Sequence, residues 1–360
     1  MKKNIFIISS ILILFLSSNV MSSQYRFLEL GTFGGNASYA YDINNIGHVV
    51  GLAYVNSYED HPFLFDGETM RDLGTLDGYY NSAYGINEED YVVGYTYVSN
   101  RAHAFLYHNY NMVDIHEYFE YFGGIWSYAE DINNSKEIVG FSNSSAILIK
   151  NNGIFYNLGT LGGATSRAYA INDCGYVVGE ADNVDGDTHA FLYAYEKMID
   201  LGTLGGDESI AYDINDAGVV VGYSESYPYN RARAFLYDGT MHNLGTLGGY
   251  KSYAYGINNS GVVVGWADDS EYDRCAFVYD NEGMHNLNEL TNLPAGWRLV
   301  TAYAINDYGD IVGYGTNSDG YTRGFVLYNN YADRTIIPEP MTLCLLGIAI
   351  SQLIRKKIHK

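Results

Sequence analysis

Three aspartates in one short stretch of the chain have the spacing with the clearest chemical meaning. Asp182, Asp185 and Asp187 surround Gly186, and carboxylate oxygens are the ligands that Ca²⁺ prefers in proteins. The stretch lacks the full spacing of a calcium-binding loop, so a solvated acidic turn is the alternative interpretation. We therefore treat these three residues as a candidate calcium site and expect no other metal and no organic cofactor.

Aromatic side chains in two irregular segments could contact a ligand. Tyr118, Tyr121 and Trp126 lie within residues 116–126, and Trp297 lies within residues 288–298. The chain has 37 tyrosines, and a ring with a polar tip suits a hydrated binding surface. These four residues are the candidate ligand-loop residues.

Signatures of catalysis are missing from the sequence. It has no serine nucleophile elbow, no zinc-binding signature and no catalytic Cys-His pattern. The carboxylate pairs that cleave glycosidic bonds are defined by their separation in space and not by a motif. We therefore expect a protein that is not an enzyme, and keep a polysaccharide lyase or hydrolase as the alternative.

The elements that must position these residues follow from an internal repeat. An Ile-Asn pair recurs seven times at spacings of 39 to 48 residues, and a glycine that ends Val-Val-Gly or Ile-Val-Gly follows each asparagine by seven residues. The asparagines are Asn44, Asn87, Asn133, Asn172, Asn215, Asn258 and Asn306, and the glycines are Gly51, Gly94, Gly140, Gly179, Gly222, Gly265 and Gly313. An apolar-aromatic run and a short fourth segment complete each unit.

Four short strands fit each unit, because β-branched and aromatic residues alternate with turn residues. Units of this length favour an all-β fold, a seven-bladed β-propeller in which neighbouring blades bury each other's apolar faces. The last unit lacks a fourth strand, and residues 26–30 form an extra one at the other end of the chain. We predict that this N-terminal strand lies beside residues 325–328 and closes the ring.

The recurring asparagine is interpreted as a turn residue without a chemical role. Its side chain can bond the backbone two residues on, and a glycine three residues later can adopt the left-handed conformation of a tight hairpin. Asp90 and Lys136 replace that glycine in two units, where we expect mild strain.

Several of the repeated motifs together resemble a known family. The order Leu-Gly-Thr-Leu-Gly-Gly, Ala-Tyr-x-Ile-Asn, Val-Val-Gly and then His-Ala-Phe, seen at 103–105 and 189–191, resembles the HAF family of probable extracellular repeats. The resemblance covers nearly all of residues 24–330 and implies an exported repeat protein with no defined reaction. His61, His103 and His189 head the same strand in different units, so we expect separate hydrogen-bonded histidines and no shared metal.

The two ends of the chain look like targeting segments. Residues 1–23 combine Lys2 and Lys3 with an apolar run and small residues, as a secretory signal peptide does. After a linker at 331–337, residues 338–360 resemble a PEP-CTERM sorting signal: Pro338-Glu339-Pro340, an apolar segment, and the basic end Arg355-Lys356-Lys357. That resemblance implies an exosortase-type sorting enzyme as a partner, transient membrane association, and a Gram-negative source. A permanent anchor is the alternative.

The formal net charge of −22 excludes one class of partner. Nucleic acids need a basic surface that the chain lacks, so we expect no nucleic acid among its partners.

From the two targeting segments we expect an inner-membrane-anchored precursor that becomes a cell-surface or extracellular protein. Its partner would be an extracellular polysaccharide or a surface protein, and its role would be that of a binding or structural module of an exopolysaccharide or biofilm matrix.

Overall fold

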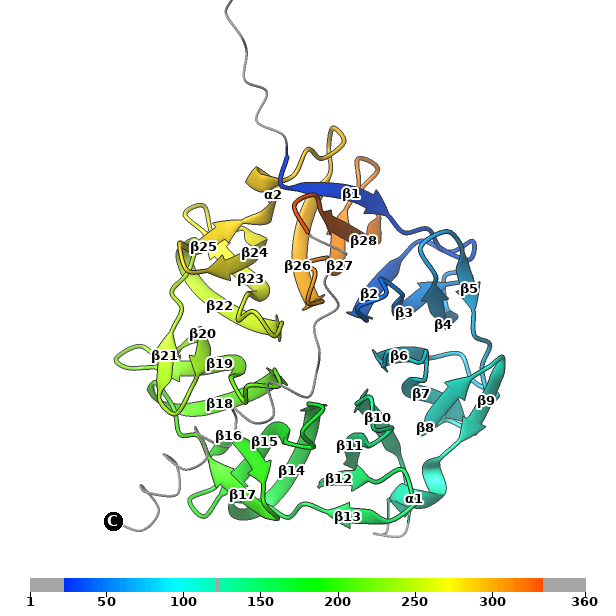
Figure 1. Cartoon of the computed structure of the whole chain (residues 1–360), viewed down its shortest axis with the longest axis vertical. Helices are drawn as coiled ribbons and strands as arrows, with labels where there is room; N and C mark the ends of the chain where they lie inside the picture. The colour runs from blue at the N-terminus through cyan, green and yellow to red at the C-terminus, as the bar shows by residue number, and fades with distance from the viewer. Residues whose placement is uncertain (1–22, 121–123, 333–360) are drawn as a thin grey trace, which may run out of the picture.

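The chain folds into a ring of seven four-stranded antiparallel sheets, the predicted seven-bladed β-propeller (Figure 1). The structure, a computed structural model, describes residues 23–120 and 124–332. The predicted signal segment up to residue 22, Tyr121 and the sorting tail lie outside the described residues. No helix in the described part is long and apolar enough to cross a bilayer.

The strands follow the repeat closely. Blade one contains β2 (Ser38–Ile43), β3 (Val49–Tyr54), β4 (Asp60–Phe65) and β5 (Met70–Asp72); blade two β6 (Asn81–Ile86), β7 (Val92–Val98), β8 (Arg101–His108) and β9 (Asn111–Asp114); blade three β10 (Ser127–Ile132), β11 (Ile138–Ser142), β12 (Ser145–Ile149) and β13 (Phe155–Asn157). Blade four contains β14 (Gly162–Ile171), β15 (Val177–Asn183), β16 (Thr188–Ala194) and β17 (Lys197–Asp200); blade five β18 (Gly205–Ile214), β19 (Val220–Ser226), β20 (Arg231–Tyr237) and β21 (Met241–Asn243). Blade six contains β22 (Gly248–Ile257), β23 (Val263–Asp269), β24 (Arg274–Asp280) and β25 (Gly283–Asn286).

Blade seven is built from both ends of the propeller. Its inner strands are β26 (Arg298–Ile305), β27 (Ile311–Thr316) and β28 (Thr322–Asn329), and its outermost strand is β1 (Tyr25–Glu29). Arg26 pairs with Tyr328 and Glu29 with Phe325. The predicted closure is confirmed, and it covers the edge of β28 that would otherwise be exposed.

Two short helices replace glycine loops between blades. Helix α1 (His116–Glu120) follows blade two, and α2 (Leu287–Leu290) follows blade six. They occupy the two segments in which the sequence departs from the repeat.

The core lies between blades, and one large side chain of each third strand is completely buried in it. Phe63, Phe105, Phe191, Phe235, Phe277 and Phe325 are completely buried, and Ile147 takes this position in blade three. Burial of such a side chain stabilises the fold by about 1.5–3 kcal/mol. The aromatic residue of the repeat is therefore a packing residue.

The repeated glycine of the second strand is required by close contact. In blade five, a Cβ on Gly222 would overlap the carbonyl oxygen of Ile210 on the inner strand. The inner strand bulges beside this contact, between Ala211 and Asp213. The other six blades have the same overlap at the equivalent glycine, which explains why the motif ends in glycine.

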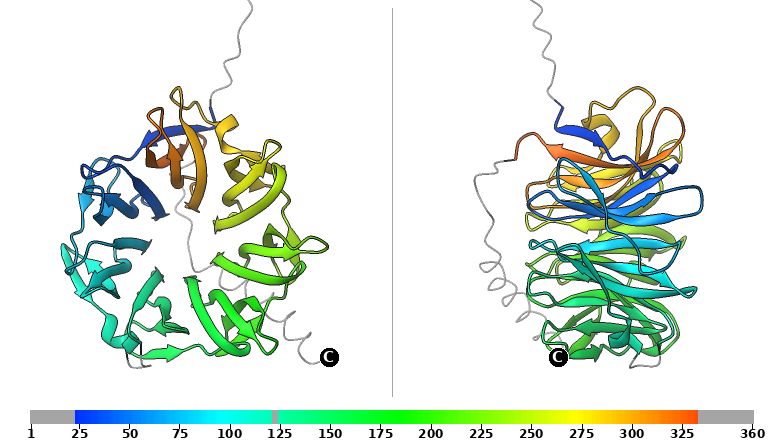
Figure 2. Two further views of the ribbon diagram at one scale, coloured as in Figure 1. Left: turned by 180° about the vertical axis from the view of Figure 1, so that it is seen from behind. Right: turned by 90° about the vertical axis from the view of Figure 1, so that its right-hand side faces the viewer.

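The ring has two different faces. Each inner strand ends in the Ile-Asn turn, and the turns between third and fourth strands lie at the same end; we call this the Asn-turn face. The turns between second and third strands and the connections between blades lie at the opposite end, which we call the loop face. Figure 2 shows the blades stacked edge-on between the two faces.

Candidate functional site

The asparagines of the Ile-Asn turns form a closed ring of hydrogen bonds around the central channel. Asn44 Nδ2 donates to the carbonyl oxygen of Asn87 at 3.1 Å, and the series continues blade by blade until Asn306 Nδ2 donates to the carbonyl of Asn44 at 3.1 Å. Each Oδ1 also accepts the backbone N–H four residues on, as in Asn215 to Val219 at 3.0 Å. The structural interpretation is confirmed, but the sequence did not indicate the contact between blades.

The left-handed turn residues are also as predicted. Gly47, Gly175, Gly218, Gly261 and Gly309 all have φ between 77° and 87°. Asp90 and Lys136, which replace glycine, have φ of 60° and 62°. At these two residues the backbone has a left-handed conformation, which is unfavourable for residues that have a side chain.

A second ring lies beside the first and is formed by the residue after each asparagine. Its seven members are Asn45, Glu88, Asn134, Asp173, Asp216, Asn259 and Asp307. The backbone N–H of each member donates to a side-chain oxygen of the next, at distances of 2.8 to 3.0 Å. The two rings line a hollow of about 190 Å³ at the mouth of the channel. Their oxygens already accept backbone N–H groups, so hydrogen bonding between blades accounts for them.

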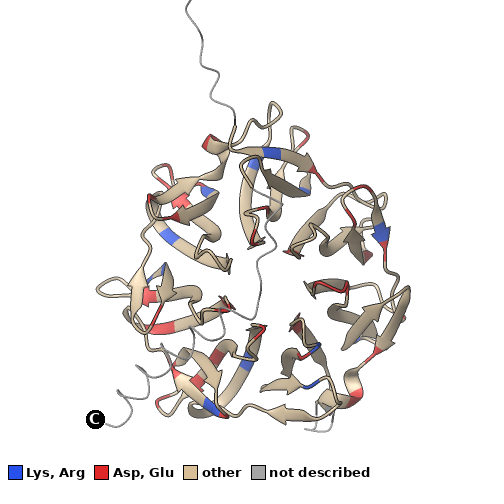
Figure 3. Ribbon diagram, viewed as in Figure 1, with Lys and Arg blue, Asp and Glu red and all other residues tan. Residues whose placement is uncertain are grey.

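Three aspartates line the channel next to these rings, in alternate blades. Asp42 accepts the N–H of Ile43 at 2.8 Å and that of Ile86, in the next blade, at 2.9 Å. Asp131 and Asp213 make the same pair of bonds between blades three and four and between blades five and six. Each carboxylate therefore joins two blades. Figure 3 shows acidic residues at the inner ends of the blades.

Burial raises the pKa of each of these channel carboxyls. The pKa of Asp42 is raised to about 8, by burial and then by the charge of Asp131. Burial raises the pKa of Asp131 to about 6 and that of Asp213 to about 7, although backbone N–H donors oppose the shift. Glu130 also has a pKa raised to about 8 by burial and by Asp131. The channel therefore carries carboxyls that change charge near neutral pH.

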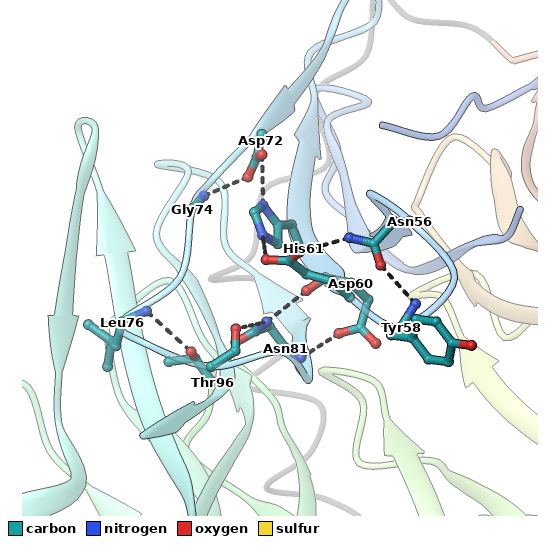
Figure 4. A network of polar contacts seen from close by, with 11 residues as sticks. Asn56, Tyr58, Asp60, His61, Asp72, Gly74, Leu76, Asn81 and Thr96 are labelled. Atoms are coloured by element: carbon teal, nitrogen blue, oxygen red, sulfur yellow. Dashed lines mark hydrogen bonds and ion pairs between the residues drawn. The ribbon is translucent and has the colours of Figure 1, made fainter. Parts of the chain in front are cut away.

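The histidines of the repeat are bonded separately, as predicted. Nδ1 of His61 lies 2.8 Å from Asp72, that of His103 lies 2.8 Å from Asp114, and that of His189 lies 2.9 Å from Asp200. Each pair joins the third and fourth strands of one blade. Figure 4 shows His61 beside Asp72, in the network that also links Asp60 to Asn81 of the next blade. Nε2 of His61 also lies 3.3 Å from Glu59.

Of the candidate calcium residues, Asp182 lies near the end of β15, and Asp185 and Asp187 lie on the turn that follows. Asp182 accepts hydrogen bonds from Thr165 Oγ1 at 2.7 Å and Thr188 Oγ1 at 3.1 Å, while Asp185 and Asp187 are exposed. Within residues 23–120 and 124–332, no three acidic, histidine or cysteine side chains are grouped as a metal site. Calcium binding at this turn stays a prediction.

The three candidate ligand-loop residues within the described part of the chain do not form one site. Tyr118, on α1, packs edge-on against Phe155 at 6.2 Å and lines a groove of about 380 Å³ between blades two and three. Trp126 is exposed at the start of blade three. Trp297 packs against Phe27 at 4.8 Å in blade seven. The sequence placed these residues in two segments that depart from the repeat, and the ring geometry keeps the two segments apart.

Exposed tyrosines gather instead on the loop face. Eight tyrosines that are 43% to 81% exposed occupy its turns and connections: Tyr58, Tyr79, Tyr80, Tyr227, Tyr229, Tyr250, Tyr272 and Tyr321. Some of these loop tyrosines are visible in the sequence, but only the strand directions place them on one face. The loop face therefore has the composition of a binding surface.

The densest aromatic contacts of this face lie between blades five and six. The rings of Tyr250 and Tyr272 are stacked at 4.5 Å, and their hydroxyl oxygens are 2.9 Å apart. The guanidinium carbon of Arg231 lies 4.0 Å from the ring centre of Tyr250 and 5.0 Å from that of Tyr229. We call these four residues the Tyr250 platform.

Comparison with known proteins adds information on the fold. A family model described as a protein of unknown function (DUF3466) matches residues 203–296, which lie in blades five and six and the connections beside them. None of the curated proteins matches the chain.

Solved structures that are similar to the chain include three from distant proteins. The β-propeller domain of the Trilobed protease from Pyrococcus furiosus, described as having an open velcro topology, is 10% identical with a TM-score of 0.51, over 84% of this chain and 98% of that one. TolB from Acinetobacter baumannii is 11% identical with a TM-score of 0.38, over 84% of this chain and 66% of that one. The gluconolactonase XC5397 from Xanthomonas campestris is 10% identical with a TM-score of 0.40, over 84% and 99%. At 10% identity, the likeness to the protease domain shows the β-propeller fold and nothing more.

Proposed function

We propose that this chain is an exported protein of the cell surface or extracellular matrix that binds polysaccharide through its loop face. The observation that carries the proposal is the gathering of eight exposed tyrosines on that face. An aromatic ring can stack on the apolar face of a pyranose, and the tyrosine hydroxyl can bond its hydroxyl groups. Tyrosine also loses little conformational entropy when it is fixed by a ligand.

Export is supported by the two ends of the sequence and by its charge. Residues 1–23 resemble a secretory signal, and 338–360 resemble a sorting tail that a membrane-embedded exosortase-type enzyme would process. The precursor would be held at the inner membrane until that step releases it. A formal net charge of −22 suits a soluble protein outside the cell.

Co-sedimentation of residues 24–337 with the exopolysaccharide of the producing organism tests the proposal, with and without Ca²⁺. Saturable pelleting is expected, and it should weaken when loop-face Tyr58 and Tyr321 are both changed to serine. The matched control changes Tyr110 and Tyr195, which are exposed at turns of the Asn-turn face. Equal binding by both double variants would contradict a role for the loop face. If pelleting depends on Ca²⁺ and Asp182→Asn loses this Ca²⁺-dependent pelleting, the calcium site is supported.

A polysaccharide lyase or hydrolase is the second candidate, favoured by one observation. Asp42, Asp131 and Asp213 lie near the ends of the inner strands of three different blades, and raised pKa values suit a general acid. The supernatant of the same experiment is therefore assayed for new reducing or unsaturated ends. New ends that disappear in Asp42→Asn would support the enzyme, whereas pelleting without new ends supports the binding module. If the protein neither pellets with the polymer nor releases new ends, a purely structural role is indicated.

A further inference from the structure

The guanidinium of Arg231 lies against two aromatic rings of the loop face. It contacts the rings of Tyr250 and Tyr229 at 4.0 and 5.0 Å and is half-buried. Among the described residues, no carboxylate forms an ion pair with it, although Arg167, Arg298 and Arg323 all have such partners. Arg231 is therefore a fixed positive charge on the loop face whose neighbours do not neutralise it.

The repeat supplies an internal comparison for Arg231. Arg101 begins β8 at the same position at which Arg231 begins β20, and both follow an asparagine with positive φ. Arg101 is exposed and has no described ring or carboxylate contact. The difference between the two arginines is the tyrosine pair, which holds the Arg231 guanidinium in one place.

The tyrosine that carries Arg231 is itself held from several sides. Arg233 donates a hydrogen bond to the carbonyl oxygen of Tyr250, Tyr272 stacks on its ring, and the two hydroxyls are bonded. The side chains of the Tyr250 platform are therefore already ordered in the folded protein before a ligand binds. Such preorganisation reduces the entropy lost on binding.

Stacking determines which part of Arg231 is open to a ligand. A guanidinium that lies against an aromatic ring uses its flat face for that contact, and its N–H edge remains available for planar, bidentate bonding to a carboxylate. Tyr229 is 73% exposed, and its ring lies beside this cation. A sugar that carries a carboxylate on its pyranose ring matches both features, with the ring on Tyr229 and the carboxylate on Arg231.

We propose that the Tyr250 platform binds a uronate residue of an acidic polysaccharide. The inference rests on the proposed function and specifies its ligand. Arg231 donates two hydrogen bonds to the uronate carboxylate, Tyr229 stacks on the pyranose ring, and Tyr250, which is itself held by Tyr272, holds the arginine. The formal net charge of −22 repels such a polymer at long range, so the local cation is what makes the contact selective.

The test compares residues 24–337 and three variants on two polymers that differ only in charge. The polymers are polygalacturonate and the neutral galactan made from it by carboxyl reduction, and the dissociation constant is measured by titration calorimetry. The variants are Arg231→Gln, Tyr229→Ala and the matched control Arg101→Gln, each checked for folding by circular dichroism. Arg231→Lys is the reserve variant, because it keeps the charge and loses the bidentate geometry.

The wild-type protein is expected to bind polygalacturonate at least about tenfold more tightly than the neutral galactan, as a charge-assisted bidentate contact allows. Arg231→Gln should remove that preference, Tyr229→Ala should weaken binding to both polymers, and Arg101→Gln should change neither. Equal binding of the two polymers, or equal loss in Arg231→Gln and Arg101→Gln, would overturn the uronate assignment while polysaccharide binding stands. Binding of neither polymer would overturn this inference; if the organism's own exopolysaccharide also fails to bind, the proposed function falls with it.

Discussion

At the scale of single residues, the molecule uses one asparagine per blade to tie seven sheets together. The side chain of Asn215 accepts a hydrogen bond from the backbone N–H of Val219 in its own turn and donates one to the carbonyl oxygen of Asn258 in the next blade. Loss of the side chain would leave buried backbone groups without partners. Such groups are expensive because they have given up their hydrogen bonds to water.

Asn215→Ala is therefore expected to lower the free energy of unfolding by about 1–3 kcal/mol, the cost of an unsatisfied buried group. Urea denaturation measures the change. The control Asn292→Ala alters an exposed asparagine and should shift stability by no more than about 0.5 kcal/mol. Equal effects of the two substitutions would show that the ring of asparagines adds nothing.

The channel carboxyls make a second prediction, on pH dependence. Asp42 has a folded-state pKa of about 8 against 3.8 for the free group, and Asp131 and Asp213 face it across the channel with raised pKa values of their own. Between about pH 4 and pH 8 the folded protein therefore holds more protons than the unfolded chain. Stability should be highest at the acidic end of this window and fall as the pH rises through it.

Asp42→Asn removes one of these ionisations, so its free energy of unfolding should fall less between pH 5 and pH 8 than that of the wild type. A difference of at least about 1.4 kcal/mol corresponds to one unit of pKa shift. Denaturant titrations at the two pH values measure it, with exposed Asp319→Asn as the control. Parallel pH profiles for the wild type and Asp42→Asn would refute the prediction.

At the scale of elements, each blade depends on a close contact between its first two strands. The bulge in the inner strand brings a carbonyl oxygen to where the Cβ of residue 222 would be. Only glycine fits at this position, so the motif requires glycine because the two strands approach closely and not because the chain must be flexible. The same contact in all seven blades explains why the motif has no exception.

Gly222→Ala should consequently destabilise the protein by about 3 kcal/mol or more, because backbone must shift to admit the methyl group. Thermal and urea unfolding measure the loss. Gly31→Ala is the matched control, since a Cβ there meets nothing within 4 Å and should change stability by less than about 0.5 kcal/mol. Similar stability of both variants would mean that the strands can separate at little cost.

At the scale of the whole molecule, net charge and local charge act in opposite directions on an acidic polymer. A formal charge of −22 repels the polymer over the Debye length, about 30 Å at 0.01 M salt and about 8 Å at 0.15 M. In the proposed complex, the contact of Arg231 with a carboxylate is short, so salt screens it less than the long-range repulsion. Added salt should thus remove more repulsion than attraction.

Affinity for polygalacturonate is accordingly expected to rise several-fold between 0.01 M and 0.15 M sodium chloride, as electrostatic screening requires. Titration calorimetry at the two salt concentrations measures it. The neutral carboxyl-reduced polymer should bind equally well at both. A steep fall in polygalacturonate affinity with salt would indicate a different, broadly basic binding surface.

The order of the strands could be predicted from the sequence because it depends on local residue patterns. Turn asparagines, left-handed glycines and alternating strands recur with a period that sets the number of blades, and the missing fourth strand of the last unit indicated that residues 26–30 close the ring. These signals depend on neighbours in the chain. The ligand-loop residues were predicted from their type and from the two segments that depart from the repeat, and the structure separates Tyr118 and Trp126 from Trp297.

Contacts between blades could be known only from the tertiary structure. Asn44 meets Asn87 because ring closure brings equivalent positions of successive repeats together, and Arg231 meets Tyr250 because it brings the third strand of blade five beside the first strand of blade six. Each blade's sequence is compatible with several arrangements of its neighbours, and packing of the buried phenylalanines selects one. The fold of this protein was thus determined by its local sequence pattern. The rings around its channel and the platform on its loop face arise from the closure of seven blades into one circle.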